Sequence, residues 1–284
     1  MVSNNIKILV AYHKKAPLIK SEIFIPIHVG KEIAFDKSKD GIISNQEMNW
    51  LEKECIGDNT GDNISKFNRF FCEMTAIYWA WKNYDKLGNP DYIGLVHYRT
   101  LFQFMKNKKN NNIVTDEELS KKILEIFYQY DIIAPSVQNV IEQSGSNDNL
   151  KNFNLDLERY PLVQRMNDKL KQDNLFYYKN MFILPRKLFF EYYSFVFDIL
   201  FSKFNTEQKH NPREIGYLAE FLTSFYLMDK KESKLKVFEE PLLTHAPKTI
   251  WQKIKRCFVK IKSKNNQVKY YFLGIKIYTH EKRK

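Results

Sequence analysis

A histidine, a tyrosine and an arginine stand together at the end of an apolar run, in "DYIGLVHYRTLF" (residues 91–102). The uncharged aromatic and branched residues predict a buried strand over residues 92–98. Side chains alternate along a strand, so we expect His97 and Arg99 on one face and Tyr98 on the other. Arginine offers a fork of donors that matches phosphate oxygens, and histidine can donate a proton. The pair suits an anion site; the alternative is a buried ion pair with a carboxylate.

Glu220 stands among apolar residues in "GYLAEFL" (residues 216–222). Burial in such surroundings would raise the pKa of the carboxyl group toward a value useful for general-base catalysis. Arg213 lies seven residues earlier and is a natural partner for a phosphate or for Glu220. The alternative for Glu220 is an outward-facing position on an amphipathic helix.

The stretch "GDNTGDNIS" (residues 57–65) carries two acidic residues, Asp58 and Asp62, between glycines. Their spacing does not match a calcium-binding EF-hand loop, which needs ligands at alternate positions and a closing glutamate. A capped turn is one interpretation. In the other, Asn63 and Ser65 lie at a helix N-terminus, where backbone N–H groups favour anions.

Strands that alternate with helices must position these residues. Apolar runs predict strands over residues 6–12, 92–98, 131–136, 176–185 and 236–246. Helical spacing predicts helices over residues 66–88, 116–130, 186–204 and 211–230, the first with Ser65 as its N-cap and Gly88 as its stop. Within the first helix, Glu73 and Thr75 are expected to be ordinary helix positions. The alternation indicates an α/β fold with many parallel pairings.

Composition limits the remaining possibilities. The 284 residues suffice for a substantial core, and the aromatic content of 15% argues against disorder. Three scattered cysteines without a CxxC pair indicate neither a zinc site nor a disulfide framework, and suit a reducing cytoplasm. No run of 18 apolar residues predicts a membrane-spanning helix, and the N-terminus reads as a core strand, not a signal peptide.

Positive charge is concentrated at the C-terminus. Residues 249–284 contain 11 Lys or Arg and one acidic residue, a net charge of +10 out of +12 for the chain. We therefore divide the chain into a domain over residues 1–248 and a tail over residues 249–284. Apolar residues at helical spacing between Ile250 and Ile261 predict a basic amphipathic helix, followed by a hairpin about Gly274. Such a helix suits an anionic membrane surface, with nucleic acid as the rival partner.

Five blocks in order resemble a known family: "IGDNTGDNIS", "FCEMTAIYWAWKN", "YIGLVHYR", "NMFILPRK" and "GYLAEF". They are similar to the bacterial capsular and exopolysaccharide biosynthesis glycosyltransferases typified by galactofuranosyltransferase-like proteins, long carried as a domain of unknown function. The resemblance covers roughly residues 5–245. The chain departs from the family pattern at Thr100, at Phe221 and over residues 141–161, and the last of these segments is expected to contact the acceptor.

The resemblance implies a GT-A-like nucleotide-sugar fold, a mixed and mostly parallel sheet flanked by helices. In such folds a strand often ends in a D-x-D motif that holds a divalent metal. Strand 92–98 supplies no carboxylate pair, and Asp91 lies at its start, about 26 Å from Arg99 at ~3.3 Å per residue. We therefore expect no metal or other cofactor, with His97 and Arg99 stabilising the leaving diphosphate instead.

The resemblance also implies roles for residues elsewhere in the chain. Glu220 would be the catalytic base, and Asn180 would contact acceptor hydroxyls, with a strand-edge position as its alternative. The implied donor-binding residues are Tyr12 (stacking on uracil), Asn63, Ser65, His97, Arg99, Arg213 and His245. An ordinary loop position is an equal alternative for His245.

The resemblance implies a glycosyltransferase that transfers a sugar from a UDP-sugar donor, with UDP-galactofuranose as one candidate. Its acceptor would be a lipid-linked glycan in capsular polysaccharide, exopolysaccharide or lipopolysaccharide synthesis, and the transfer would be inverting. Residues 249–284 would hold it in the cytoplasm on the inner face of the bacterial plasma membrane. One alternative is a non-catalytic, membrane-associated scaffold protein with a decayed site. An RNA-binding protein is disfavoured because the body is nearly neutral.

Overall fold

The structure is a computed structural model. It describes residues 5–37, 41–107, 110–139, 159–173, 175–206 and 210–244, and the backbone of three strands beyond residue 257. The chain divides into two units, Met1–Leu243 and Thr244–Lys284, and each is described by itself.

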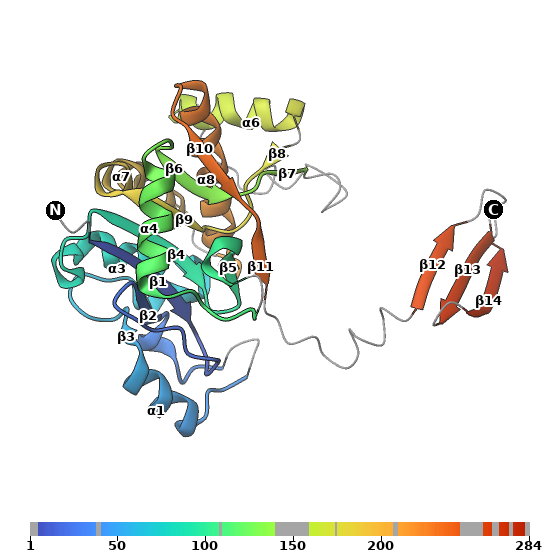
Figure 1. The fold of residues 1–284 in the computed structure, drawn as a ribbon, viewed down its shortest axis with the longest axis horizontal. Coiled ribbons are helices and arrows are strands. Elements are labelled where there is room, and N and C mark those ends of the chain that lie inside the picture. The colour runs from blue at the N-terminus through green and yellow to red at the C-terminus, as the bar shows by residue number, and fades with distance from the viewer. Residues whose placement is uncertain are drawn as a thin grey trace. The chain divides into compact units, whose positions relative to one another are not determined.

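A mixed sheet forms the centre of the first unit, in the order β10-β6-β9-β4-β1-β2-β3 (Figure 1). Its strands are β1 (Ile6–Tyr12), β2 (Phe24–His28), β3 (Ile56–Gly57), β4 (Tyr92–His97), β6 (Ile132–Pro135), β9 (Phe182–Pro185) and β10 (Val237–Glu240). Strand β9 is antiparallel to both neighbours, and the other pairings along this path are parallel. Two short strands, β5 (Thr100–Phe102) and β11 (Leu242–Thr244), pair with each other beside β4.

Helices cover both faces of this sheet because its strands bury apolar side chains on both sides. Leu9 and Ala11 of β1 face one hydrophobic cluster, and Ile8 and Val10 face the other. The first cluster includes α2 (Asn68–Phe71), α3 (Met74–Lys82), α6 (Pro161–Asp173), α7 (Arg186–Thr206) and α8 (Glu214–Glu232). The second includes α1 (Asn45–Glu54) and α4 (Asp116–Phe127). The predicted α/β class, a mostly parallel sheet flanked by helices, is confirmed.

The helix predicted over residues 66–88 is wrong as one element. It is broken at Cys72, whose φ of 53° and ψ of −133° lie outside the helical region, so α2 and α3 are separate. Ser65 begins a short 3-10 helix (Ser65–Phe67) and is not an N-cap, because its hydroxyl bonds Asp58 instead. Gly88, with a φ of 76°, does end the last 3-10 turn, as predicted.

Other predicted boundaries also change. Strand β4 ends one residue early, at His97, and the predicted strand over residues 176–185 is divided into β8 (Leu175–Phe176) and β9. Helices α1 and α6 lie in segments without a clear periodicity in the sequence. The start of α1 has a local signal nonetheless: Ser44 and Glu47 form a reciprocal capping box.

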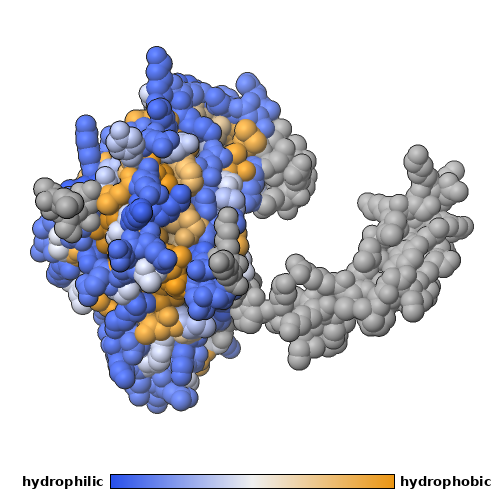
Figure 2. Space-filling view, viewed as in Figure 1, coloured by the Kyte–Doolittle hydropathy of each residue, from blue (hydrophilic) through white to orange (hydrophobic). Residues whose placement is uncertain are grey.

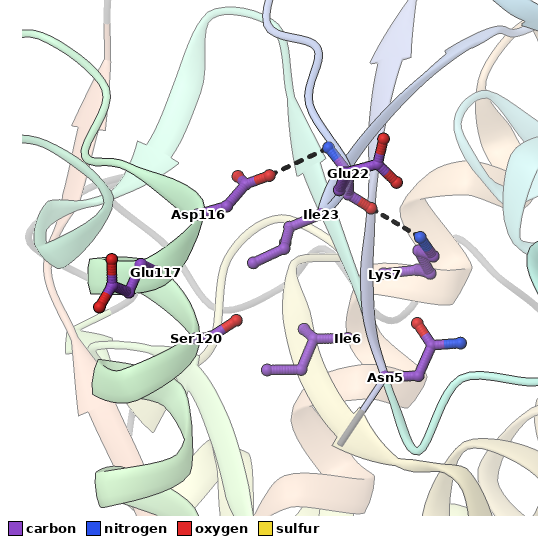
Figure 3. A pocket seen from close by; sticks show the side chains of 8 residues that line it. All are labelled: Asn5, Ile6, Lys7, Glu22, Ile23, Asp116, Glu117 and Ser120. Atoms are coloured by element: carbon purple, nitrogen blue, oxygen red, sulfur yellow. Dashed lines mark hydrogen bonds between the residues drawn. The ribbon is translucent and has the colours of Figure 1, made fainter. Parts of the chain in front are cut away.

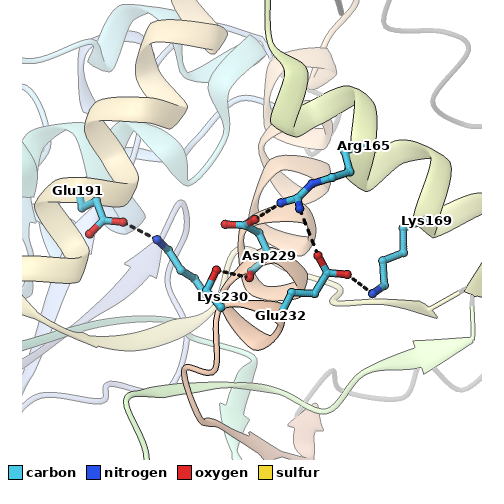
Figure 4. A network of polar contacts seen from close by, with 7 residues as sticks. Arg165, Lys169, Glu191, Asp229, Lys230 and Glu232 are labelled. Atoms are coloured by element: carbon cyan, nitrogen blue, oxygen red, sulfur yellow. Dashed lines mark hydrogen bonds and ion pairs between the residues drawn. The ribbon is translucent and has the colours of Figure 1, made fainter.

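Ion pairs hold the C-terminal half of α8 between α6 and α7 (Figure 4). Arg165 of α6 pairs with Asp229 and, at 3.6 Å, with Glu232, which also pairs with Lys169. On the other side, Lys230 lies 2.6 Å from Glu191 of α7. These contacts fix the helix whose N-terminal half carries Glu220.

The second unit contains an antiparallel sheet of three strands, β12 (Phe258–Lys262), β13 (Gln267–Phe272) and β14 (Ile275–Glu281). The helix predicted between Ile250 and Ile261 is therefore wrong from Phe258 onward, because this part pairs with β13. The connection between β13 and β14 lies at the hairpin predicted about Gly274.

The surface of the first unit mixes hydrophilic and hydrophobic residues on the face drawn in Figure 2. None of the helices in the described part of the chain has the length and hydrophobicity needed to cross a membrane.

Candidate active site

The carboxyl ends of β1 and β4 meet at one edge of the sheet, because the two strands are parallel. His97 ends β4, pairs with Ala11 of β1, and also pairs with Thr100 across a tight turn. This turn contains Tyr98 and Arg99, so the predicted alternation of faces stops at His97. The guanidinium of Arg99 instead lies over the ring of Tyr98, 4.9 Å from its centroid.

A cluster of polar residues, here called the carboxylate cluster, forms near this edge. It comprises Glu73 before α3, His97 at the end of β4, Lys179 and Asn180 before β9, Arg213 directly before α8, and Glu220 within α8. Sequence separation within the cluster is large: Glu73 and Asn180 are 107 positions apart. The sheet and the helices on one of its faces bring these residues together.

Asn180 links three elements of the cluster. Its Nδ2 donates to Oε1 of Glu73 over 2.8 Å and to the carbonyl of Gly216 over 3.4 Å. Its Oδ1 accepts from the hydroxyl of Thr223 over 3.0 Å. Asn180 is fully buried, so in this structure it holds Glu73 and does not present its amide to solvent. This position differs from the predicted acceptor contact.

Glu220 is half-buried and its pKa is raised to about 7. Burial is the main cause, because it disfavours the ionised form, and the nearby charge of Glu73 adds to it. The backbone N–H and the charge of Lys179 and the charge of Arg213 oppose the rise. At neutral pH the carboxyl of Glu220 can therefore both accept and release a proton.

The pKa of His97 is lowered, first because burial disfavours the imidazolium. The carboxylate of Glu73 opposes this shift, and the ammonium of Lys179 adds to it. Nε2 of His97 is buried and has no hydrogen-bond partner among the described residues. Within that part of the chain, no carboxylate lies at ion-pairing distance from Arg99, so the buried ion pair considered above is not formed there. An unsatisfied ring nitrogen is a group that a ligand could bind.

Backbone strain is concentrated around the cluster. Among the described residues, six non-glycine residues have a positive φ, and three of them are Cys72 (53°), Lys179 (66°) and Arg213 (69°). Each adjoins or belongs to the carboxylate cluster. Strained residues of this kind cost about 1–3 kcal/mol each and gather at functional sites.

Arg213 lies at the start of α8, where its N–H donates to the carbonyl of Arg69 over 2.7 Å. Its side chain hydrogen bonds the thiol of Cys72, and its guanidinium lies 5.2 Å from the ring centroid of Tyr217. Tyr217 is 46% exposed. The predicted donor-binding residue thus lies beside Glu220, with an open aromatic ring next to it.

Side chains of the "GDNTGDNIS" loop accept hydrogen bonds from backbone N–H groups nearby. Asp58 is fully buried and accepts from the N–H groups of Gly30 (2.7 Å) and Lys31 (3.1 Å) and from the hydroxyl of Ser65 (2.5 Å). Asn63 accepts from the N–H of Ser65 over 3.1 Å. These bonds agree with the capped-turn interpretation, and they occupy the side chains of Asn63 and Ser65 that were predicted to bind a donor.

Tyr12 is fully buried and is part of the core. Its ring stacks on Tyr98 with centroids 5.2 Å apart, and its hydroxyl bonds the carbonyl of Pro17 and the N–H of Ile19. In this structure no face of the ring is open for the predicted stacking on uracil. His245 and most of the divergent segment over residues 141–161 lie outside the described residues.

A pocket at the opposite end of β1 is separate from the carboxylate cluster (Figure 3). It is lined by Asn5, Ile6, Lys7, Glu22, Ile23, Asp116, Glu117 and Ser120. Its residues lie at the amino end of β1, whereas His97 lies beside the carboxyl end. Within the described ranges, no group of three or more His, Cys, Asp or Glu side chains is arranged to hold a metal ion.

Sequence reasoning assigns no special role to Glu73 or Lys179, which the structure places in the cluster. A signal for Glu73 exists in the block "FCEMT", which is part of the resemblance. What the pattern does not show is that the chain turns at Cys72 and directs Glu73 toward Asn180.

A family model described as a domain of unknown function, DUF4422, matches residues 7–232. The solved structures include a similar chain, the apo form of the bifunctional glycosyltransferase WbbM, with a TM-score of 0.65 and 26% sequence identity. The match covers 86% of this chain and 46% of that chain, so this chain spans about half the length of that protein. No curated protein matches. The likeness confirms the predicted GT-A-like fold of a glycosyltransferase.

Proposed function

The chain belongs to the DUF4422 family, and from this premise we propose that it is a glycosyltransferase acting on a nucleotide-sugar donor and a glycan acceptor. Support comes from its similarity over most of its length to one part of a bifunctional glycosyltransferase. The observation that carries the proposal is Glu220, a half-buried acid with a pKa of about 7, which shares the neighbours Glu73 and Lys179 with His97 at the end of β4.

In the proposed reaction an acceptor hydroxyl attacks the anomeric carbon of the donor sugar. The bond from that carbon to the acceptor oxygen forms, and the bond to the diphosphate oxygen breaks. Glu220 takes the proton of the hydroxyl as attack proceeds. Arg99 and the unsatisfied Nε2 of His97 stabilise the negative charge that grows on the leaving diphosphate. Attack from the face opposite the leaving group makes the transfer inverting.

UDP-sugars are the donors proposed from the sequence resemblance, with UDP-galactofuranose as the first to test. The same resemblance supports a lipid-linked glycan of capsular polysaccharide, exopolysaccharide or lipopolysaccharide synthesis as the acceptor. The net charge of +10 on residues 249–284 supports a position on the inner face of the plasma membrane. In the proposed mechanism Arg99 and His97 take the place of a divalent metal.

A panel of UDP-sugars, each incubated with the protein and with lipid-linked glycans, tests the function through the release of UDP. The expected result is release from one donor, with turnover lowered by roughly 10²- to 10⁴-fold in Glu220→Gln. A Glu232→Gln variant is the matched control, because it removes an acid from the other end of the same helix. A wild-type protein that neither binds a donor nor releases UDP would support the non-catalytic scaffold with a decayed site instead.

A further inference from the structure

The side chain of Glu73 does not cap α3, the helix that it directly precedes: it makes no capping hydrogen bond to that helix. The strained backbone of Cys72 separates Glu73 from α2, and the carbonyl of Cys72 is held by Nδ2 of Asn68 over 2.7 Å and by Oγ1 of Thr75 over 3.1 Å. The chain therefore directs the carboxylate of Glu73 away from its own helix and into the cluster.

A relay of hydrogen bonds from Tyr192 through Thr223 to Asn180 orients the amide of Asn180, the partner of Glu73. The hydroxyl groups of Tyr192 and Thr223 lie 2.5 Å apart, and Thr223 donates to Oδ1 of Asn180. With Oδ1 so occupied, the Nδ2 of Asn180 faces Glu73. All three relay residues are buried, so their orientation is set by the core between α7, α8 and β9.

We propose that Glu73 is the positioning residue that makes Glu220 a strong enough base to take the proton of the acceptor. This inference rests on the proposed glycosyltransferase function. Glu73 touches neither reacting atom in this scheme and acts through the field of its charge. When the proton of the acceptor moves to Glu220, the repulsion between two neighbouring carboxylates is relieved, which favours the transfer.

The charged and titratable groups that face the two acids come from every element packed around them. Glu220 faces Glu73, Cys72, Lys179 and Arg213, and Glu73 also faces His97 and Tyr193 of α7. The two cations stabilise the ionised form of Glu220, and Glu73 opposes them, adding to the effect of burial on the proton affinity of Glu220. Among these groups, Glu73 is the acid whose side chain is held in place by a hydrogen bond from Asn180.

The test is a direct titration of Glu220 in the full chain. Carbon-13 NMR of glutamate carboxyl groups follows its ionisation, with the signal assigned by its loss in Glu220→Gln. Glu73→Gln keeps an oxygen for Asn180 and removes the charge, so the pKa of Glu220 should fall by about one unit. Glu73→Ala, a second neutral variant, should give the same direction if the glutamine variant does not fold. Glu73→Asp should keep most of the shift.

Enzyme kinetics supply the second measurement. The acidic limb of the pH profile of kcat/KM should move to lower pH in Glu73→Gln by the same amount, with a lower plateau, while UDP binding is unchanged. Glu232→Gln should leave both the titration and the profile in place. A Glu220 pKa that does not change in the neutral variants overturns the inference, and so does an unmoved profile in an active enzyme. If the wild-type protein transfers no sugar, the proposed function fails, and the titration still decides whether Glu73 controls Glu220.

Discussion

Nδ2 of Asn180 donates a hydrogen bond to Oε1 of Glu73 over 2.8 Å, and the same amide accepts one from Thr223. Asn180→Ala would remove both bonds; Thr223 keeps its bonds to Tyr192 and to the carbonyl of Ala219, whereas Glu73 loses its bond to the amide. Unsatisfied groups of this kind cost about 1–3 kcal/mol. We expect urea unfolding to show a loss of this size, whereas Asn112→Ala, at an exposed site, should change stability by less than about 0.5 kcal/mol. Equal stability of the two variants would contradict the relay.

Glu220 should destabilise the fold at high pH, because its pKa in the folded protein, about 7, exceeds its ordinary value of 4.5. Between these values the folded state binds more protons than the unfolded state, so this contribution to stability grows as the pH falls through 7 and is lost as the pH rises. Glu220→Gln removes the buried charge. We expect it to be more stable than the wild type at pH 8 by about 1–3 kcal/mol, since one pKa unit corresponds to about 1.4 kcal/mol.

The stability gain of Glu220→Gln should shrink when urea unfolding is repeated at pH 5. Glu232→Gln should show no gain at pH 8, because contact with Lys169 lowers the pKa of that acid. If Glu220→Gln is less stable than the wild type at pH 8, burial of the ionised carboxylate of Glu220 does not destabilise the fold.

Arg99 should contribute to the binding of a nucleoside diphosphate. Hydrogen bonds to charged groups contribute about 1.5–3 kcal/mol, so Arg99→Ala should weaken UDP binding by roughly tenfold or more in calorimetry. Arg99→Lys should restore only part of the UDP affinity, because lysine lacks the planar, forked set of N–H donors of arginine. Arg186→Ala is the control, since Arg186 binds the carbonyl of Pro90 at the other end of β4. Unchanged affinity in Arg99→Ala would remove this residue from the site.

Sugar transfer should persist in the presence of EDTA. The sequence has no D-x-D motif at the end of β4, and the carboxylate of Asp58 is already bonded to Gly30, Lys31 and Ser65. The measurement is UDP release with and without chelator. Complete loss of activity, restored by manganese, would reveal a metal site and refute this prediction.

The C-terminal residues should bind membranes through their charge. A protein truncated after Lys248 keeps the whole first unit, so we expect it to fold and to bind UDP as the full chain does. It should no longer sediment with anionic vesicles, and binding of the full chain should weaken with salt, because exposed charges are screened within about 10 Å. Sedimentation of the truncated protein with such vesicles would place the membrane contact in the first unit.

Local patterns in the sequence determined much of the fold. The apolar run of residues 6–12 matches β1 in both bounds, and Gly88 ends its turn, because hydrophobic alternation and glycine conformations are local properties. The apolar surroundings of Glu220 likewise indicated a raised pKa. Strand β12 shows the limit of this approach, since apolar residues at helical spacing there pair with β13 as a strand, whereas β13 and β14 agree with the predicted hairpin.

Only the tertiary structure decided which side chains meet. Glu73, Asn180 and Glu220 lie far apart along the chain, and no periodicity relates them; packing of α3, β9 and α8 on one sheet brings them together. Tyr12 is at the end of β1 as expected, but its ring is buried in the core, where it stacks on Tyr98. The strain at Cys72, Lys179 and Arg213 is also a property of the whole fold, because such backbone conformations persist only where surrounding contacts enforce them.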